Sequence, residues 1–297
     1  MGRSKVTTAG WLDTLEAFKV VMMAQGKTRT TVKAYRQGVS LFGRWCEAQG
    51  LEPVGAPETA VIRFVGESYE SRTLGTTQHR ILALRCWFRW LVATGKRKAD
   101  PTASLKLRPI HRQPRRPYTD EELRALLAAT QNDPPRALRD TTILLLFIGG
   151  GLRLSELTAM RTEDIDWEAG RILVHGKGQR ERWIAPGKAA MASLAEYLAR
   201  DREPTIFAIG GAAVEYMIHR LATEAGLTEI HPHGFRRTFA CRFAEISGDI
   251  GALQTILGHA NIGMSLYYAG YTVRARALDQ QARLGLADRL VEPAMAR

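Results

Sequence analysis

Four separated segments of the sequence carry polar side chains of types that suit chemistry at a phosphate. In chain order these residues are Arg153, Lys177, His233, Arg236, His259 and Tyr268. A phenol can act as a nucleophile, guanidinium groups can hold anionic oxygens, and imidazole or ammonium groups can transfer protons. Each residue alone has an ordinary explanation as a surface arginine, a turn lysine or a structural histidine. Their order and spacing therefore matter more than any single member.

Taken together, these segments resemble the catalytic domain of the tyrosine recombinases, the phage integrase family. The signature of that family is an early Arg, a hairpin Lys, a His-x-x-Arg pair, a Leu-Gly-His segment and a Tyr nine residues after that His. Here Lys177 follows Arg153 by 24 residues, and Tyr268 follows His259 by nine. Every position of the signature is filled.

Tyr268 is accompanied by two other tyrosines, Tyr267 and Tyr271. The nine-residue offset selects Tyr268, and consecutive helical residues point about 100° apart, so one of the adjacent pair can face a phosphate. The resemblance implies that Tyr268 becomes covalently bonded to a DNA phosphate. A phenol with a pKa near 10 is a weak nucleophile, and the resemblance makes His233 the group that takes its proton.

The remaining signature residues would act on the phosphate itself. Arg153 and Arg236 would hold the non-bridging oxygens as negative charge develops there. Lys177 would protonate the leaving 5′ oxygen, and His259 would add a hydrogen bond. We expect no metal and no cofactor, because no Asp or Glu cluster offers a two-metal site and the glycines at 149–151 lack the Lys-Ser/Thr of a nucleotide-binding loop.

Positive charge is concentrated in the N-terminal third of the chain. Residues 1–117 hold 21 Lys and Arg against 8 Asp and Glu, a balance of +13, whereas residues 118–297 hold 21 against 22, a balance of −1. A basic first segment predicts binding to a polyanion, with double-stranded DNA as the leading partner. The candidate DNA contacts are Arg80, Arg85, Arg89, Arg112, Arg115 and Arg116.

Apolar residues at helical spacing predict an all-helical N-terminal domain, residues 1–97, with helices near 11–26, 32–45, 59–69 and 81–91. Its aromatic residues are interpreted as core, in preference to base-stacking platforms. Residues 98–117 form a basic, proline-rich linker, either a plain connector or, as we favour, a segment that lies along a phosphate backbone. Residues 118–297 form the catalytic domain.

The catalytic domain should begin with a helix capped by Thr119 and Glu122, followed by a buried helix at 139–149 and a helix at 154–160. Segments 171–174 and 182–185 flank a glycine-rich turn and predict a β-hairpin. The expected fold class is mainly α with a small antiparallel sheet in the C-terminal domain. The amphipathic tail after Tyr271 packs either on its own domain or, as the resemblance implies, on a neighbouring protomer.

The resemblance implies site-specific recombination, by a homotetramer on two DNA sites that exchanges strands through a Holliday junction. Accessory DNA-bending or directionality proteins are possible partners. Residues 1–9 are too few for an additional arm-type domain, so we expect a minimal two-domain enzyme. An integrase of a phage or mobile element ranks slightly above a Xer-type dimer resolvase. A type IB topoisomerase and a non-catalytic DNA-binding protein are the remaining alternatives.

The sequence also favours a cytoplasmic, nucleoid-associated protein without membrane contact. The longest apolar run, 141–148, is far shorter than the roughly 20 residues that span a bilayer. No apolar segment or cleavage site follows the basic N-terminus, and the three cysteines are widely separated, as expected for reduced thiols.

Overall fold

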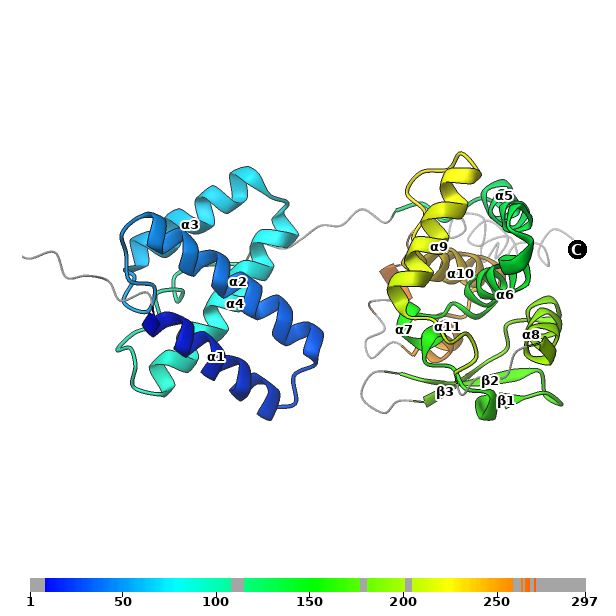
Figure 1. The fold of residues 1–297 in the computed structure, drawn as a ribbon, viewed down its shortest axis with the longest axis horizontal. Coiled ribbons are helices and arrows are strands. Elements are labelled where there is room, and N and C mark those ends of the chain that lie inside the picture. Colours follow the sequence, from blue (N-terminus) through cyan, green and yellow to red (C-terminus); the bar gives the residue numbers. More distant parts are fainter. Residues whose placement is uncertain are drawn as a thin grey trace, which may run out of the picture. The chain divides into compact units, whose positions relative to one another are not determined.

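The computed structural model describes residues 9–107, 115–176, 181–200, 205–258, 263, 265–267 and 270. The chain divides into two compact units, Met1–Arg112 and Gln113–Arg297 (Figure 1). Among the helices described, none combines the length and the apolar character needed to cross a membrane. The expected fold class, mainly α with a small antiparallel sheet in the second unit, is confirmed.

The first unit is a bundle of helices, coloured blue to cyan in Figure 1. They are α1 (Ala9–Ala24), α2 (Arg29–Ala48), α3 (Glu58–Ser71) and α4 (Leu74–Ala93). Thr28 and Thr73 begin α2 and α4, because each side chain accepts a hydrogen bond from a backbone N–H of the first turn. The last helix starts well before position 81, where the sequence predicted it. The prediction missed its first two turns because they carry mostly polar residues and so lack an apolar pattern.

Aromatic side chains fill the core of this unit, which confirms their interpretation as packing residues. The Phe42 ring meets Phe64 and Phe88 edge-on, with centroids 5.3 Å and 5.8 Å apart. Trp87 and Phe18 are also buried. Edge-to-face pairs add to the stabilisation from apolar burial, so the bundle has a core of its own.

The second unit surrounds a larger apolar core with helices and one sheet. Its first half contains α5 (Asp120–Ala129), η1 (Thr130–Asn132), α6 (Pro134–Gly150), α7 (Leu154–Thr158) and η2 (Thr162–Asp164). It continues with β1 (Ile165–Asp166), β2 (Arg171–His175), β3 (Glu181–Ile184), α8 (Lys188–Arg200), α9 (Gly211–Glu224), α10 (Pro232–Ser247) and α11 (Ile250–Leu257). Within this unit the sheet lies along one edge, where β3 packs against α11 (Figure 1).

Local signals in the sequence account for the start of this unit. The predicted capping box is present: the Thr119 N–H donates to Glu122 Oε2 at 2.8 Å, and the Glu122 N–H donates to Thr119 Oγ1 at 3.2 Å. The buried helix expected at 139–149 is the C-terminal part of α6. The next helix, α7, ends at Thr158 and not at Met160 as expected, because buried Met160 continues in a turn that packs into the core.

The predicted hairpin is confirmed as β2 and β3, which pair antiparallel with Val174 opposite Arg182. A third strand, β1, pairs with the other edge of β2. Its two residues are too few to give an alternating pattern, which is why the sequence did not predict it. Ile172, Val174 and Ile184 are buried beneath the sheet, so the pleat also turns Arg182 toward the interior.

Candidate active site

Arg153 occupies the N-cap position of α7, directly after a sharp end to the preceding helix. Gly151 ends α6 with a φ of +58°, and a Cβ there would come within 2.5 Å of the Phe239 ring. Only glycine suits both the left-handed backbone and this close approach. The Arg153 guanidinium donates to Glu156 Oε1 at 2.6 Å, and its backbone N–H donates to Oε2 at 2.8 Å. Its side chain remains 35% exposed.

The Glu156 carboxylate is buried and binds more than one guanidinium. Arg182, on β3, approaches it with two nitrogens, at 2.9 Å and 2.8 Å from Oε1 and Oε2. Burial alone would raise the pKa of Glu156, but hydrogen bonds from Arg182 and from the backbone and side chain of Arg153 lower it to about 2. The carboxylate is therefore ionised at neutral pH.

Arg236 lies one turn into α10, and it is almost completely buried. Its guanidinium donates to the carbonyl oxygens of Gly151, at 2.8 Å, and Leu257, at 2.6 Å. The Glu156 carboxylate is 3.8 Å away. Arg236 thus joins the end of α6 to the end of α11, and in this conformation Arg153 is the more accessible of the two predicted phosphate ligands.

Arg182 completes the connection between the hairpin and α11. Besides holding Glu156, its Nε donates to the Ile256 carbonyl oxygen at 2.6 Å. Carbonyls at the end of a helix lack partners within the helix, and guanidinium groups satisfy them well. Segments that are distant in sequence, on α7, β3, α10 and α11, therefore meet around one carboxylate.

His233 lies in the first turn of α10, three residues before Arg236, with an exposed side chain. Partial desolvation lowers its pKa, and the positive charges of Arg236 and Arg237 lower it further. A neutral imidazole is the form that can accept a proton. The environment therefore suits the role expected of this residue.

Three of the six expected catalytic residues, Lys177, His259 and Tyr268, lie outside the described residues. The structure describes the positions beside them. Strand β2 ends at His175 and β3 begins at Glu181. Of the tyrosine pair, Tyr267 is described and is 38% exposed. Within the described part of the chain, no group of three or more His, Cys, Asp or Glu side chains is arranged to hold a metal ion.

The expected DNA contacts on α4 differ in how freely their guanidiniums can reach a ligand. Arg80 donates to Ser68 Oγ at 3.0 Å, and Arg85 donates to the Leu105 carbonyl oxygen at 2.5 Å. Both are partly buried. Arg89 is 69% exposed and lies 3.6 Å from Asp100, so it is the best placed of the three to meet solvent.

The linker arginines are also unequal. Arg115 is exposed. Arg116 forms a bidentate pair with Glu122, at 2.7 Å and 2.6 Å, although its side chain is 57% exposed. Arg112 lies outside the described residues. Arg116 can form a bidentate contact with a phosphate only after its ion pair with Glu122 on α5 breaks.

Glu156 and Arg182 were not singled out as functional residues from the sequence. The available signal for Glu156 was a carboxylate three residues after Arg153, a spacing at which opposite charges on a helix can pair. For Arg182 it was an arginine at an inward-facing position of the predicted hairpin strand. Neither signal shows which residue the side chain pairs with, because that depends on the folded structure.

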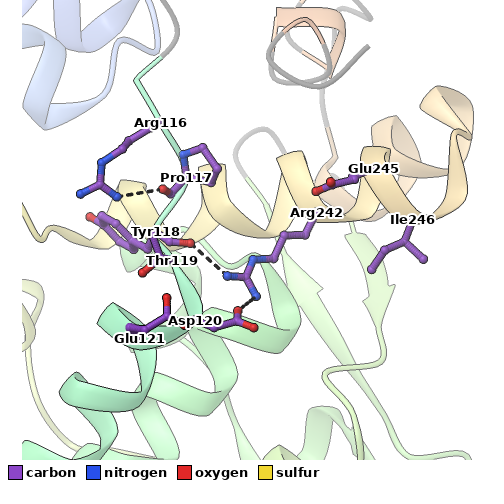
Figure 2. A pocket seen from close by; sticks show the side chains of 9 residues that line it. All are labelled: Arg116, Pro117, Tyr118, Thr119, Asp120, Glu121, Arg242, Glu245 and Ile246. Carbon is purple, nitrogen blue, oxygen red and sulfur yellow. Dashed lines mark hydrogen bonds and ion pairs between the residues drawn. The ribbon is translucent and has the colours of Figure 1, made fainter. Parts of the chain in front are cut away.

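A hollow of about 560 Å³ lies elsewhere on this unit, between the start of α5 and the C-terminal half of α10 (Figure 2). Its lining includes Tyr118, Asp120, Arg242 and the exposed Ile246. Of the expected catalytic residues that the structure describes, none of Arg153, His233 and Arg236 lines it, so the described part of the site is a cluster of charges apart from this hollow.

The chain is similar in sequence to known proteins. The phage integrase family matches residues 117–273. Tyrosine recombinase XerC of Xanthomonas campestris pv. campestris (strain B100) is 34% identical over 252 residues, covering 80% of this chain and 77% of that protein. Tyrosine recombinase XerC of Chromohalobacter salexigens is 35% identical over 256 residues, covering 80% and 84%.

The fold has solved counterparts as well. A crystal structure of a lambda integrase dimer bound to a COC′ core site matches 86% of this chain and 76% of that one, with a TM-score of 0.70 and 17% identity. At that identity the likeness concerns the fold alone. With the family match over residues 117–273 and relatives above 30% identity over most of its length, this chain belongs to the phage integrase family, the tyrosine recombinases.

Proposed function

We propose that this chain cleaves and rejoins DNA at a specific site, with Tyr268 as the nucleophile and a 3′-phosphotyrosine as the covalent intermediate. The observation that carries the proposal is the cluster of Arg153, Arg182 and Arg236 around the single carboxylate of Glu156. Three guanidiniums and one carboxylate leave two positive charges (3 − 1 = 2). Such a cluster suits a phosphodiester.

In the proposed reaction, the phenolic oxygen of Tyr268 forms a bond to phosphorus as the bond from phosphorus to the 5′ oxygen breaks. His233 takes the phenolic proton, and Lys177 gives a proton to the 5′ oxygen. The product is a 3′-phosphotyrosine and a free 5′ hydroxyl. One phosphoester replaces another, so rejoining to a second 5′ hydroxyl needs no ATP.

Arg153 and Arg236 would bind the non-bridging oxygens, with a hydrogen bond from His259. Glu156 would act as a positioning residue, since it holds Arg153 and Arg182 in place before DNA arrives. Fixed donors that need no rearrangement during the reaction stabilise developing charge most effectively. Arg236 is buried in this conformation, so its contact with a phosphate requires its guanidinium to become accessible.

The proposed partner is double-stranded DNA, bound by the basic N-terminal unit and the linker, with Arg89 and Arg115 as the most accessible of the described candidate contacts. The lambda integrase of similar fold was crystallised as a dimer on a core site. By analogy, we propose that four protomers act on two DNA sites in the nucleoid. Accessory proteins and packing of the C-terminal tail on a neighbouring protomer belong to the same proposal.

A covalent-trapping experiment tests the nucleophile on DNA of mixed sequence, in which the target site need not be specified. The full-length protein is incubated with nicked, fragmented genomic DNA of its source, denatured, and assayed for protein-linked DNA. We expect adducts with the unmodified protein and with Tyr267→Phe, and none with Tyr268→Phe. No adduct with the unmodified protein would refute the proposed chemistry. Adducts that persist in Tyr268→Phe would refute the choice of tyrosine.

A Xer-type role in resolving chromosome or plasmid dimers is a second candidate, and the relatives named XerC favour it. Sequencing the trapped DNA separates the two roles. Adducts at one recurrent chromosomal or plasmid site, apart from mobile elements, would support dimer resolution. Adducts at the ends of a mobile element would support an integrase. A type IB topoisomerase would instead relax a supercoiled plasmid that lacks the recovered site.

A further inference from the structure

The end of the basic linker is fastened to the start of α10, the helix that carries His233 and Arg236. Tyr118 directly follows Pro117, and its side chain is buried. Its hydroxyl accepts a hydrogen bond from the His231 backbone N–H at 2.9 Å and lies 3.0 Å from His231 Nδ1. His231 is the N-cap residue of α10, so Tyr118 contacts the helix where it begins.

Further hydrogen bonds tie the same part of the linker to the body of α10. The Tyr118 N–H donates to Thr238 Oγ1 at 2.8 Å, and Arg237 Nε donates to the Arg116 carbonyl oxygen at 3.1 Å. Arg242 donates to the Tyr118 carbonyl oxygen at 3.0 Å and pairs with Asp120 at 2.5 Å (Figure 2). The linker end and three turns of α10 are thus held together.

The position of Tyr118 also explains why the residue that follows His233 is a glycine, Gly234. A Cβ on Gly234 would lie 1.8 Å from the Tyr118 hydroxyl oxygen and 2.2 Å from Cζ. Any other residue at 234 would displace either the tyrosine or the first turn of the helix. The phenol therefore packs against the backbone between His233 and Arg236.

The loop before α10 is strained, and the same hydroxyl group stabilises it. Glu229 has a φ of +60° without being glycine, a conformation that persists when its surroundings hold it. The Tyr118 hydroxyl can donate to the carbonyl oxygens of Glu229, at 3.3 Å, or His231, at 3.2 Å. Burial raises the pKa of Tyr118, so the hydroxyl remains protonated and able to donate.

We propose that Tyr118 is a positioning residue for DNA cleavage: it fixes the first turn of α10, and with it His233 and Arg236, to the end of the linker. The inference rests on the proposed roles of His233 and Arg236. It adds that the linker, which we propose binds DNA, is joined by hydrogen bonds to the helix that carries the proposed general base. A displacement of about 1 Å at a catalytic group can cost about 100-fold in rate.

The primary test compares Tyr118→Phe with Tyr197→Phe, which removes the hydroxyl of another buried tyrosine, on α8. The substrate is a nicked duplex with the site recovered by trapping. For Tyr118→Phe we expect the single-turnover rate constant of adduct formation to fall about tenfold, with DNA affinity unchanged within about twofold. The pH midpoint of that rate should also shift. Tyr197→Phe should match the unmodified protein in all three.

These readouts separate positioning from a loss of folding. A purely structural role would lower the amplitude of adduct formation but leave the rate constant and its pH midpoint unchanged, and that result would overturn the proposal. NMR gives a readout that needs no DNA, from the backbone amide resonance of His231, whose N–H donates to the Tyr118 hydroxyl, and from the titration of the His233 ring, whose pKa is lowered. We expect both signals to change in Tyr118→Phe. If the unmodified protein forms no adduct but these signals change, the proposed function fails while the positioning contact stands.

A second pair of variants tests the contact with Gly234. In the unmodified background we expect Gly234→Ala to lower the melting temperature and the cleavage rate severely, because the new Cβ meets the phenol. With Tyr118→Ala in place, the same substitution should have a much smaller effect. Equal effects of Gly234→Ala in both backgrounds, on melting temperature and rate alike, would show that Tyr118 does not control this turn.

Discussion

Replacing Glu156 by glutamine tests whether the buried carboxylate organises the site. Glutamine imitates the protonated form, so the cost of the change follows from the pKa. The pKa is lowered from an ordinary 4.5 to about 2. At 1.36 kcal/mol for each pKa unit, the ionised carboxylate contributes about 3 kcal/mol to folding at neutral pH. Side-chain burial of Glu156, at 3% exposure, leaves little screening by solvent.

The sign of the pH dependence follows from the direction of the pKa. A carboxyl group whose pKa is depressed in the folded state stabilises the protein fully above its unfolded value of about 4.5. That contribution disappears as the pH falls toward 2. The unmodified protein and Glu156→Gln should therefore differ by about 3 kcal/mol at pH 7 and converge progressively at acidic pH.

Urea unfolding of both proteins at pH 7, 5 and 3.5 measures this difference, with Glu163→Gln as the control. Glu163 also pairs with an arginine, at 3.1 Å, but its side chain is 73% exposed, so its replacement should change stability by less than about 0.5 kcal/mol. Adduct formation by Glu156→Gln should be slowed about 100-fold, because the guanidiniums lose their anchor. A Glu156→Gln protein within about 1 kcal/mol of the unmodified protein at pH 7, or a gap that does not narrow between pH 5 and 3.5, would refute the reasoning.

Three further outcomes follow from the described residues. Gly151→Ala should destabilise the chain by several kcal/mol, because the positive φ and a ring 2.5 Å from the new Cβ act together. The control Gly170→Ala, with a φ of +62° in open space, should cost about 1 kcal/mol. Equal melting temperatures of the two variants would contradict this prediction. Hydrogen bonds that the His175 ring donates to the carboxylates of Asp164 and Glu181 raise the pKa of His175. The stability that His175→Gln removes should therefore be largest below pH 6.5 and vanish as the pH rises through the folded pKa, as urea unfolding at pH 6 and 9 would show. The lowered pKa of His233 predicts that the rate of adduct formation falls at acidic pH, with a midpoint below 6.5. His233→Ala should lose this acidic pH dependence while retaining DNA affinity. A midpoint above 6.5 would contradict the role of neutral His233.

Much of the fold was accessible from the sequence because local signals and apolar periodicity agreed. Thr119 and Glu122 predicted the start of α5 from four consecutive positions, and the inward residues of β2 and β3 predicted the hairpin. The exceptions arose where the apolar pattern was too short or continued beyond the end of the helix. A two-residue strand has no alternation to detect, and Met160 kept the apolar spacing of a helix after α7 had ended.

The candidate site was only partly accessible from the sequence, since it is assembled from contacts between distant residues. Spacing and resemblance predicted Arg153, His233 and Arg236 as candidates. They did not show that Arg182 forms a bidentate pair with Glu156, 26 positions away, or that Tyr118 reaches His231, 113 positions away. A charged residue on a strand is ordinarily solvated, and only tertiary packing makes its partner a requirement.

The charge balance of the cluster bears on the reaction as well as on folding. Three guanidiniums without a counter-charge would repel one another and disfavour the folded site, and Glu156 offsets one of them. The remaining two positive charges exceed the single charge of a phosphodiester. As the phenolic oxygen adds to phosphorus, charge on the phosphoryl oxygens grows toward two. Under the proposed mechanism the cluster would match the transition state better than bound DNA, which is the condition for electrostatic catalysis.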